Sequence, residues 1–146
     1  MSPFRSVSRT GMTLVELTVV IAIIGLTSMI VVREVWRYLD RLAVRNAVAE
    51  AATVVGRARS EALAQRAIVS LSIDTATATL ALRARGQTLV RHALGHAHGV
   101  SISTTRDSIA FDVRGLGYGA ANLTLVARRG SAADTLVVSR LGRVRY

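Results

Sequence analysis

Three histidines stand close together in the second half of the sequence, at His92, His96 and His98. His96 and His98 are two residues apart, so a strand would place both imidazoles on one face, where they could bind a metal ion with His92 as a third ligand. The surrounding segment, HALGHAHG, favours an exposed loop instead, and no acidic residue lies within several positions to complete a site. The sequence therefore predicts no metal site and no cofactor.

Other residues that could support catalysis form no recognisable arrangement. Ser101, Ser103 and Ser108 lie near the histidines in the sequence, but no nucleophile elbow or oxyanion motif marks them. The GLGYG segment at 115–119 has the spacing of a nucleotide-binding loop but no helix after it, so it predicts a turn. The chain has no cysteine, and all 19 basic residues are arginine. Thiol chemistry, Schiff-base lysines and phosphate-binding lysines are excluded, and we expect no catalytic residues and no enzymatic activity.

The arginines give the chain a formal net charge of +10 at pH 7, and several of them gather near the C-terminus. In an extended strand Arg143 and Arg145 point to the same face, so with Arg140 they could clamp the phosphates of DNA. Tyr118 and Tyr146 are the only nearby aromatic residues that could stack on bases. Alternatively, these arginines pair with acids of an adjacent subunit or face solvent.

An apolar run from Leu17 to Val32 dominates the N-terminal part of the chain. Sixteen helical residues span roughly 24 Å, and adding residues 12–16 brings the segment to the length that crosses a bilayer core of about 30 Å. Arg5 and Arg9 precede the run and place the N-terminus in the cytoplasm. A cleaved signal peptide would need a small-x-small site after the run, but VREVWRYLDRL follows. A plain signal anchor would leave Glu16, inside the apolar stretch, unexplained.

The residues around Glu16 resemble the processing motif of type IV prepilins. The motif is a short basic leader, then GMTLVEL at 11–17, then the long apolar run. The resemblance implies that a membrane prepilin peptidase cuts after Gly11 and methylates the new N-terminus at Met12. It also implies that Glu16 acts in assembly, where its charge is neutralised by the N-terminal amine of a neighbouring subunit. Met12 replaces the usual phenylalanine, and Arg33 replaces a usual proline, so we expect no proline kink in the helix.

The region after the apolar run predicts a continuation of the same helix to about Arg66. It contains no proline, and its apolar residues fall at spacings of three and four. This stripe comprises Val44, Val48, Ala51, Val55, Ala58 and Ala62. A second, basic stripe comprises Arg33, Arg37, Arg41 and Arg45, with Glu34 and Asp40 as neighbours that relieve the repulsion. The basic stripe is a solvated face, or it contacts lipid phosphates or acidic patches of neighbouring subunits.

From residue 67 onward the pattern changes to short alternating segments separated by glycines. Strands are predicted at 69–73, 79–83, 88–91, 100–103, 109–113, 123–127, 136–139 and 143–146, with a turn at 74–77. A long helix followed by strands predicts an α+β fold in which an antiparallel sheet packs on the helix. We expect four segments: a leader at 1–11, a membrane and assembly half of the helix at 12–34, an amphipathic half at 35–66, and a β-rich head at 67–146.

The second half of the chain is similar to the GspH/FimT-type family of minor pseudopilins and minor pilins. The similar features are Arg59 and Glu61 before the first strand, the segment from Phe111 to Gly115, and a terminal Gly-Arg-x-Arg that begins at Gly142. The resemblance implies a type IV pilin-like fold, with a long N-terminal helix as membrane stalk packed on a small antiparallel β-sheet head.

The same resemblance implies a minor subunit of a type II secretion pseudopilus or a type IV pilus. Its expected partners are other pilins or pseudopilins, the prepilin peptidase, the inner-membrane assembly platform and the lipid bilayer. It would cross the inner membrane once, with the N-terminus cytoplasmic and the head periplasmic, and enter a filament after assembly. The alternative is a minor pilin that binds DNA during natural transformation, through Arg140, Arg143 and Arg145.

Overall fold

The computed structural model describes residues 11–119 and 122–146, so the predicted leader lies outside the described residues except for Gly11. The chain divides into two compact units, one ending at Trp36 and the other beginning at Arg37. One helix, α1 (Leu14–Gln65), contributes to both units.

The first unit consists of the N-terminal part of α1, whose apolar side chains are all exposed. Its most apolar 18-residue window has a mean hydropathy of 2.5, and none of that window is buried. Within the part of the chain that the structure describes, α1 is the one helix long and apolar enough to cross a membrane. Helical structure continues through Arg33, as expected from an arginine in place of the proline that is usual in prepilins.

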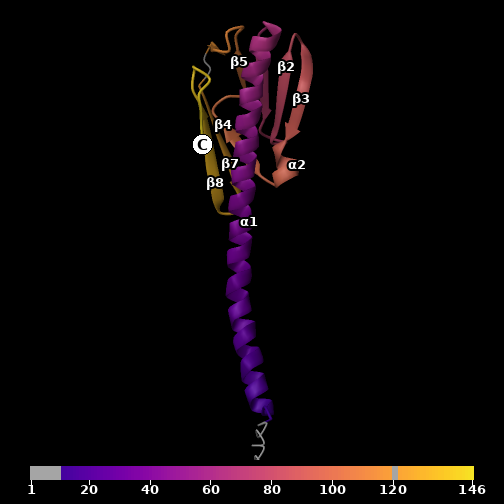
Figure 1. The fold of residues 1–146 in the computed structure, drawn as a ribbon, viewed down its shortest axis with the longest axis vertical. Coiled ribbons are helices and arrows are strands. Elements are labelled where there is room, and N and C mark those ends of the chain that lie inside the picture. Colours follow the sequence, from indigo (N-terminus) through magenta and orange to yellow (C-terminus); the bar gives the residue numbers. More distant parts are fainter. Residues whose placement is uncertain (1–10, 120–121) are drawn as a thin grey trace, which may run out of the picture. The chain divides into compact units, whose positions relative to one another are not determined.

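The second unit contains two antiparallel sheets and one short helix. Its elements are β1 (Val69–Asp74), β2 (Thr79–Ala84), β3 (Gln87–Ala93), α2 (Leu94–His98), β4 (Ser101–Thr104), β5 (Ser108–Phe111), β6 (Gly117–Tyr118), β7 (Leu123–Arg129), β8 (Ala132–Val138) and β9 (Val144–Arg145). The first sheet has the order β3-β2-β1-β5-β6 and the second has the order β4-β7-β8-β9. In Figure 1 the part of α1 that belongs to this unit lies across both sheets.

The core forms where the apolar stripe of α1 meets the inward faces of the strands. All six residues of the predicted stripe are buried, and Ala47 and Val54 are buried with them. The strands contribute alternate residues, as in β1, where Val69, Leu71 and Ile73 are buried. The prediction of an α+β fold, with a long helix packed on antiparallel strands, is therefore confirmed, and most of the predicted strands are present within one or two residues of their expected ends.

Five details differ from the prediction. The strands form two sheets rather than one. The strand predicted at 136–139 begins already at Ala132, because β8 pairs with β7 along its whole length. The predicted strand at 109–113 ends at Phe111, because Asp112 turns the chain by accepting hydrogen bonds from the N–H groups of Arg114 and Leu116. The GLGYG turn contains the two-residue strand β6, and the predicted histidine loop contains the end of β3 and the helix α2.

Candidate functional site

The N-terminal segment places Glu16 in the first turn of α1. Thr13 precedes the helix, and its Oγ1 accepts a hydrogen bond of 3.2 Å from the backbone N–H of Glu16. This is the Thr-x-x-Glu pattern of a helix N-terminus, where a carboxylate is also favoured by the helix dipole. Sequence reasoning overlooked this local role, although the spacing of Thr13 and Glu16 was visible. The carboxylate of Glu16 makes no hydrogen bond or ion pair within the described residues.

The residues next to the predicted cleavage point are accessible. Gly11 and Met12 are exposed and precede the helix. A Cβ built on Gly11 would meet no atom within 4 Å. Exposed residues outside a helix are the preferred kind of site for proteolysis.

A basic groove lies where the C-terminal arginines meet the loops after β4 and β6. One part, of about 430 Å³, is lined by Arg140, Arg143 and Arg145 together with Asn122, Val137, Ser139 and Leu141. A second part, of about 370 Å³, shares Asn122 and Arg140 and adds Arg106 and Gly119. We call the two parts together the C-terminal groove. It brings together the three arginines that the sequence singled out, and it adds Arg106, which sequence reasoning missed.

Close packing at Gly142 positions the arginines of the C-terminal groove. Gly142 has a φ of +71°, and a Cβ there would lie 3.4 Å from the ring of Phe111 and 3.5 Å from the side chain of Arg59. Gly115, also at +71°, approaches the side chains of Arg59 and Leu63. Four of the residues that carried the family resemblance therefore pack together just before Arg143: Arg59, Phe111, Gly115 and Gly142.

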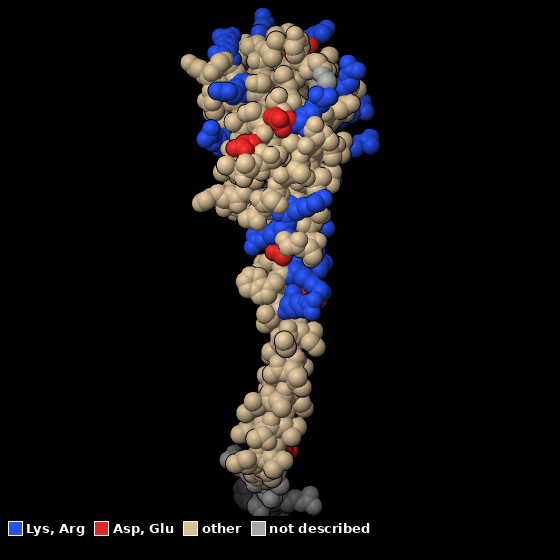
Figure 2. Space-filling view, turned by 180° about the vertical axis from the view of Figure 1, so that it is seen from behind, with Lys and Arg blue, Asp and Glu red and all other residues tan. Residues whose placement is uncertain are grey.

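The charge of the C-terminal groove is unbalanced. Four arginines line it and no acidic residue does, among the residues that the structure describes. Arg143 and Arg145 are exposed and alternate with the half-buried Val144, as expected for one strand face. Tyr118 and Tyr146 are also exposed. Figure 2 shows many more basic than acidic side chains on the face that it presents.

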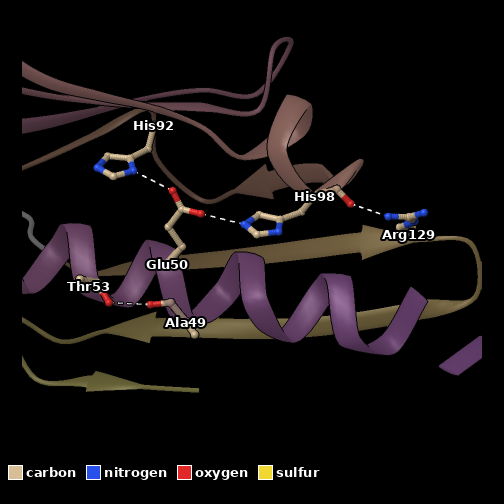
Figure 3. Close-up of polar contacts among 6 residues, drawn as sticks. All are labelled: Ala49, Glu50, Thr53, His92, His98 and Arg129. Carbon is tan, nitrogen blue, oxygen red and sulfur yellow. Dashed lines mark hydrogen bonds and ion pairs between the residues drawn. The ribbon is translucent and has the colours of Figure 1, made fainter. Parts of the chain in front are cut away.

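The histidines differ from the prediction of an exposed loop. His92 on β3 and His98 on α2 are partly buried and meet at Glu50 of α1 (Figure 3). Of the three histidines, His96 is the one that is exposed. The Nδ1 of His92 and the Nε2 of His98 each lie 2.7 Å from one carboxylate oxygen of Glu50. Because an ionised carboxylate only accepts hydrogen bonds, both of these ring nitrogens carry a proton.

The two imidazoles lower the pKa of Glu50. Partial burial raises that pKa, but the hydrogen bonds from His98 and His92 and the charges of both rings lower it below its usual 4.5. We call Glu50, His92 and His98 the histidine cluster. Sequence reasoning found the histidines but missed Glu50, because 42 and 48 residues separate it from them. No group of three metal-binding side chains has metal-ligand geometry within residues 11–119 and 122–146.

A second polar contact joins α1 to the same region. The side chain of Arg129 donates a hydrogen bond of 2.7 Å to the carbonyl oxygen of His98, and its Nε lies 3.0 Å from Oδ1 of Asp40. Asp40 therefore pairs with Arg129, in addition to its predicted place beside the basic stripe. Together with the histidine cluster, this contact attaches α1 to α2, β3 and β7.

The sequence was compared with models of protein families and with curated proteins. A family model described as "Type II transport protein GspH" matches residues 47–142. Comparison of the sequence with curated proteins gave no match.

Solved structures of two proteins share the fold, and they confirm the predicted type IV pilin-like fold. The type IV minor pilin FimU of Pseudomonas aeruginosa matches with a TM-score of 0.61 and 21% sequence identity, covering 74% of this chain and 90% of FimU. The minor pseudopilin EpsH, from the type 2 secretion system of Vibrio cholerae, matches with a TM-score of 0.57 and 13% identity. That match covers 70% of this chain and 94% of EpsH.

Proposed function

Because the chain belongs to the GspH family of type II transport proteins, we propose that it works as a structural subunit of a pseudopilus or pilus. In this proposal a prepilin peptidase removes residues 1–11 and methylates Met12. The apolar part of α1 holds the subunit in the inner membrane, with the second unit in the periplasm. During assembly α1 leaves the lipid and packs against the helices of other subunits.

The observation that carries the proposal is the exposed apolar surface of α1, which contains a single acid between Met12 and Val32. A soluble protein would bury such an apolar surface. A simple membrane anchor would not need a carboxylate in the first turn of its apolar helix, where Glu16 lies. Glu16 has no partner for its carboxylate within the described residues. The amine of a neighbouring processed subunit would neutralise it, and a wrong register would leave a charge unpaired in an apolar bundle.

Substitution of Glu16 tests assembly separately from processing. Glu16→Ala is expected to be processed like the wild type but to be strongly depleted from filaments, because the charge that sets the register is lost. Glu34→Ala is the matched control, since Glu34 lies on the same helix beyond the apolar run. Processing is read from gel mobility, and incorporation from the amount in sheared filaments. Wild-type incorporation of Glu16→Ala would refute the assembly role.

A second candidate function is DNA binding through the C-terminal groove. Its support is a groove with four arginines and no acid among the described residues. Guanidinium groups on one exposed strand face suit a row of phosphates, and such binding weakens steeply with salt. DNA binding by this groove would favour a role in DNA uptake over a role in secretion.

The test is titration of the mature chain, in detergent, with duplex DNA at two salt concentrations. Arg143→Ala plus Arg145→Ala is expected to weaken DNA binding by about tenfold or more. It should also reduce the slope of log affinity against log salt concentration by the amount expected for about two phosphate contacts. Arg83→Ala plus Arg91→Ala is the control, because it removes the same charge from exposed positions on β2 and β3. Equal losses in the two double variants, or no binding at low salt, would exclude a DNA site in this groove.

A further inference from the structure

The strand β8 has an edge that is only partly used. On one side β8 pairs with β7 along its whole length, from Ala132 to Val138. On the other side the two residues of β9 pair only with Val137 and Val138. Among the described residues, no strand pairs with 132–136 on that side, so these residues present a free sheet edge. Proteins usually cover or block such edges, because another chain can pair with them.

The backbone N–H of Thr135 already has a hydrogen-bond acceptor when no other chain is bound to this edge. The N–H of Thr135 donates a hydrogen bond of 2.8 Å to Oδ1 of Asp134, the side chain of the preceding residue. The N–H of Ser139 faces the β9 side, because it donates to the carbonyl oxygen of Arg143. Alternate residues of a strand direct their N–H groups to the same side, so the N–H of Thr135 faces the free edge. The carboxylate oxygen of Asp134 therefore accepts the hydrogen bond that the carbonyl oxygen of an added strand would otherwise accept from Thr135.

A basic groove adjoins this edge. It has a volume of about 380 Å³ and lies between the start of β8 and one face of α1, lined by Arg37, Arg41, Val44, Arg45, Ser131, Ala132, Ala133 and Asp134. The three arginines follow one another at four-residue spacing, so they form a row along the helix. Arg41 and Arg45 are exposed and pair with no acid among residues 11–119 and 122–146. We call this the α1–β8 groove.

We infer that the α1–β8 groove docks an extended acidic segment of a neighbouring protein subunit, which adds a strand to the free edge of β8. Residues 132–134 belong both to the groove wall and to the free edge, so a strand on that edge begins beside the arginines. Backbone hydrogen bonds supply affinity, and carboxylates reaching Arg41 and Arg45 supply selectivity. The small side chains of Ser131, Ala132 and Ala133 leave room for a passing chain.

Charge complementarity decides the kind of occupant. Residues 12–146 contain 17 arginines and nine acids, and most of the acids in the second unit are already engaged. A second copy of this chain would thus bring more positive charge to the groove. The occupant is a different, acidic subunit, and this identification of the partner rests on the filament function proposed above.

A synthetic peptide tests the surface without requiring a filament. The probe is a capped, fluorescein-labelled peptide of alternating glutamate and valine, titrated into the mature chain in detergent and followed by anisotropy. Arg41→Ala plus Arg45→Ala should weaken binding by about tenfold. Arg83→Ala plus Arg91→Ala, of equal charge change, should alter it by less than about twofold. Asp134→Ala should tighten binding by about threefold, because it removes a like charge and frees the N–H of Thr135.

Two further probes separate strand pairing from simple charge attraction. Peptides N-methylated at alternate residues, in both registers, should include one that no longer binds, because one face of its backbone cannot pair. The bound parent peptide should slow amide exchange at Thr135. Equal losses in the two double-arginine variants, binding of both N-methylated peptides like the parent, or no binding of the acidic peptide would each overturn the inference. Because none of these assays needs assembly, they can fail while the Glu16 experiment succeeds, and the reverse also holds.

Discussion

Replacing Glu50 with alanine is expected to destabilise the second unit, because one carboxylate holds two histidines from other elements. Glu50 lies on α1, His92 on β3 and His98 on α2, and both contacts measure 2.7 Å. Truncation leaves the two ring N–H groups without their acceptor. It also removes one of the two polar contacts that attach α1 to α2.

The size of the effect follows from the exposure of the three side chains. Hydrogen bonds to charged groups contribute about 1.5–3 kcal/mol when well shielded. Here the side chains of His92, His98 and Glu50 are 29%, 20% and 32% exposed, so water screens the bonds. We therefore expect about 1 kcal/mol for each bond, or about 2 kcal/mol for Glu50→Ala. For a unit of this size the melting temperature should fall by about 6–10 °C.

The assay is thermal unfolding of the mature chain in detergent, followed by the circular dichroism of the sheets. Glu61→Ala is the matched control, because Glu61 lies on the same helix and its contacts, with Gln65 and Arg57, stay within that helix. The control should melt within about 2 °C of the wild type. If Glu50→Ala melted like Glu61→Ala, the histidine cluster would contribute nothing to stability and the reasoning would fail.

The same cluster predicts a pH dependence of known sign. The pKa of Glu50 is lowered in the folded chain, so its contribution is fully present above the usual value of 4.5. The contribution is lost as the pH falls through the lowered folded pKa, where the carboxylate becomes protonated in both states. The difference in melting temperature between wild type and Glu50→Ala should therefore shrink as the pH falls from about 4.5 toward 3. A difference that grows over this range would contradict the assigned shift.

Three further predictions concern processing and packing. Gly11→Leu should block removal of the leader, and Gly11→Ala should not; a mature-sized band for Gly11→Leu on a gel would refute the cleavage point. Gly130→Ala should destabilise the second unit by about 1–2 kcal/mol in denaturant titration. Gly130 has a φ of +55°, and the new Cβ would lie 2.5 Å from Oδ2 of Asp40. Unchanged stability would show that the Asp40 side chain moves away at no cost. Leu71→Ala should cost about 2–5 kcal/mol, because Leu71 is fully buried, and a cost under 1 kcal/mol would show that the core at β1 collapses into the space.

Much of the fold was predictable from local pattern. The apolar stripe of α1 has the helical period, so all six of its residues could be identified as core. The alternation of apolar and polar residues in β1 and β2 likewise predicted which side chains of these strands point into the core. The short helix α2 and the strand β6 have five and two residues, too few for any period to appear. The division into two sheets depends on strand pairing, which periodicity does not encode.

The candidate sites were predictable to different degrees. Arg140, Arg143 and Arg145 are close in sequence and remain close in the fold, so their grouping could be predicted. Arg106 lies between β4 and β5, and it joins these arginines only because β4 pairs with β7 in one sheet while β5 pairs with β1 and β6 in the other. Glu50 is separated from its histidines by more than forty residues, and the free edge of β8 exists only because β9 is short. Each of these features depends on tertiary contacts between distant segments.

The central claim is that the chain is a processed pilin-like subunit whose mature N-terminus is Met12. Intact-mass measurement of the chain purified from membranes, with fragmentation of its N-terminal peptide, tests this most directly. We expect a chain of residues 12–146 that carries one methyl group on the amine of Met12. A chain that still begins at Met1, or one cut after the apolar run, would contradict it.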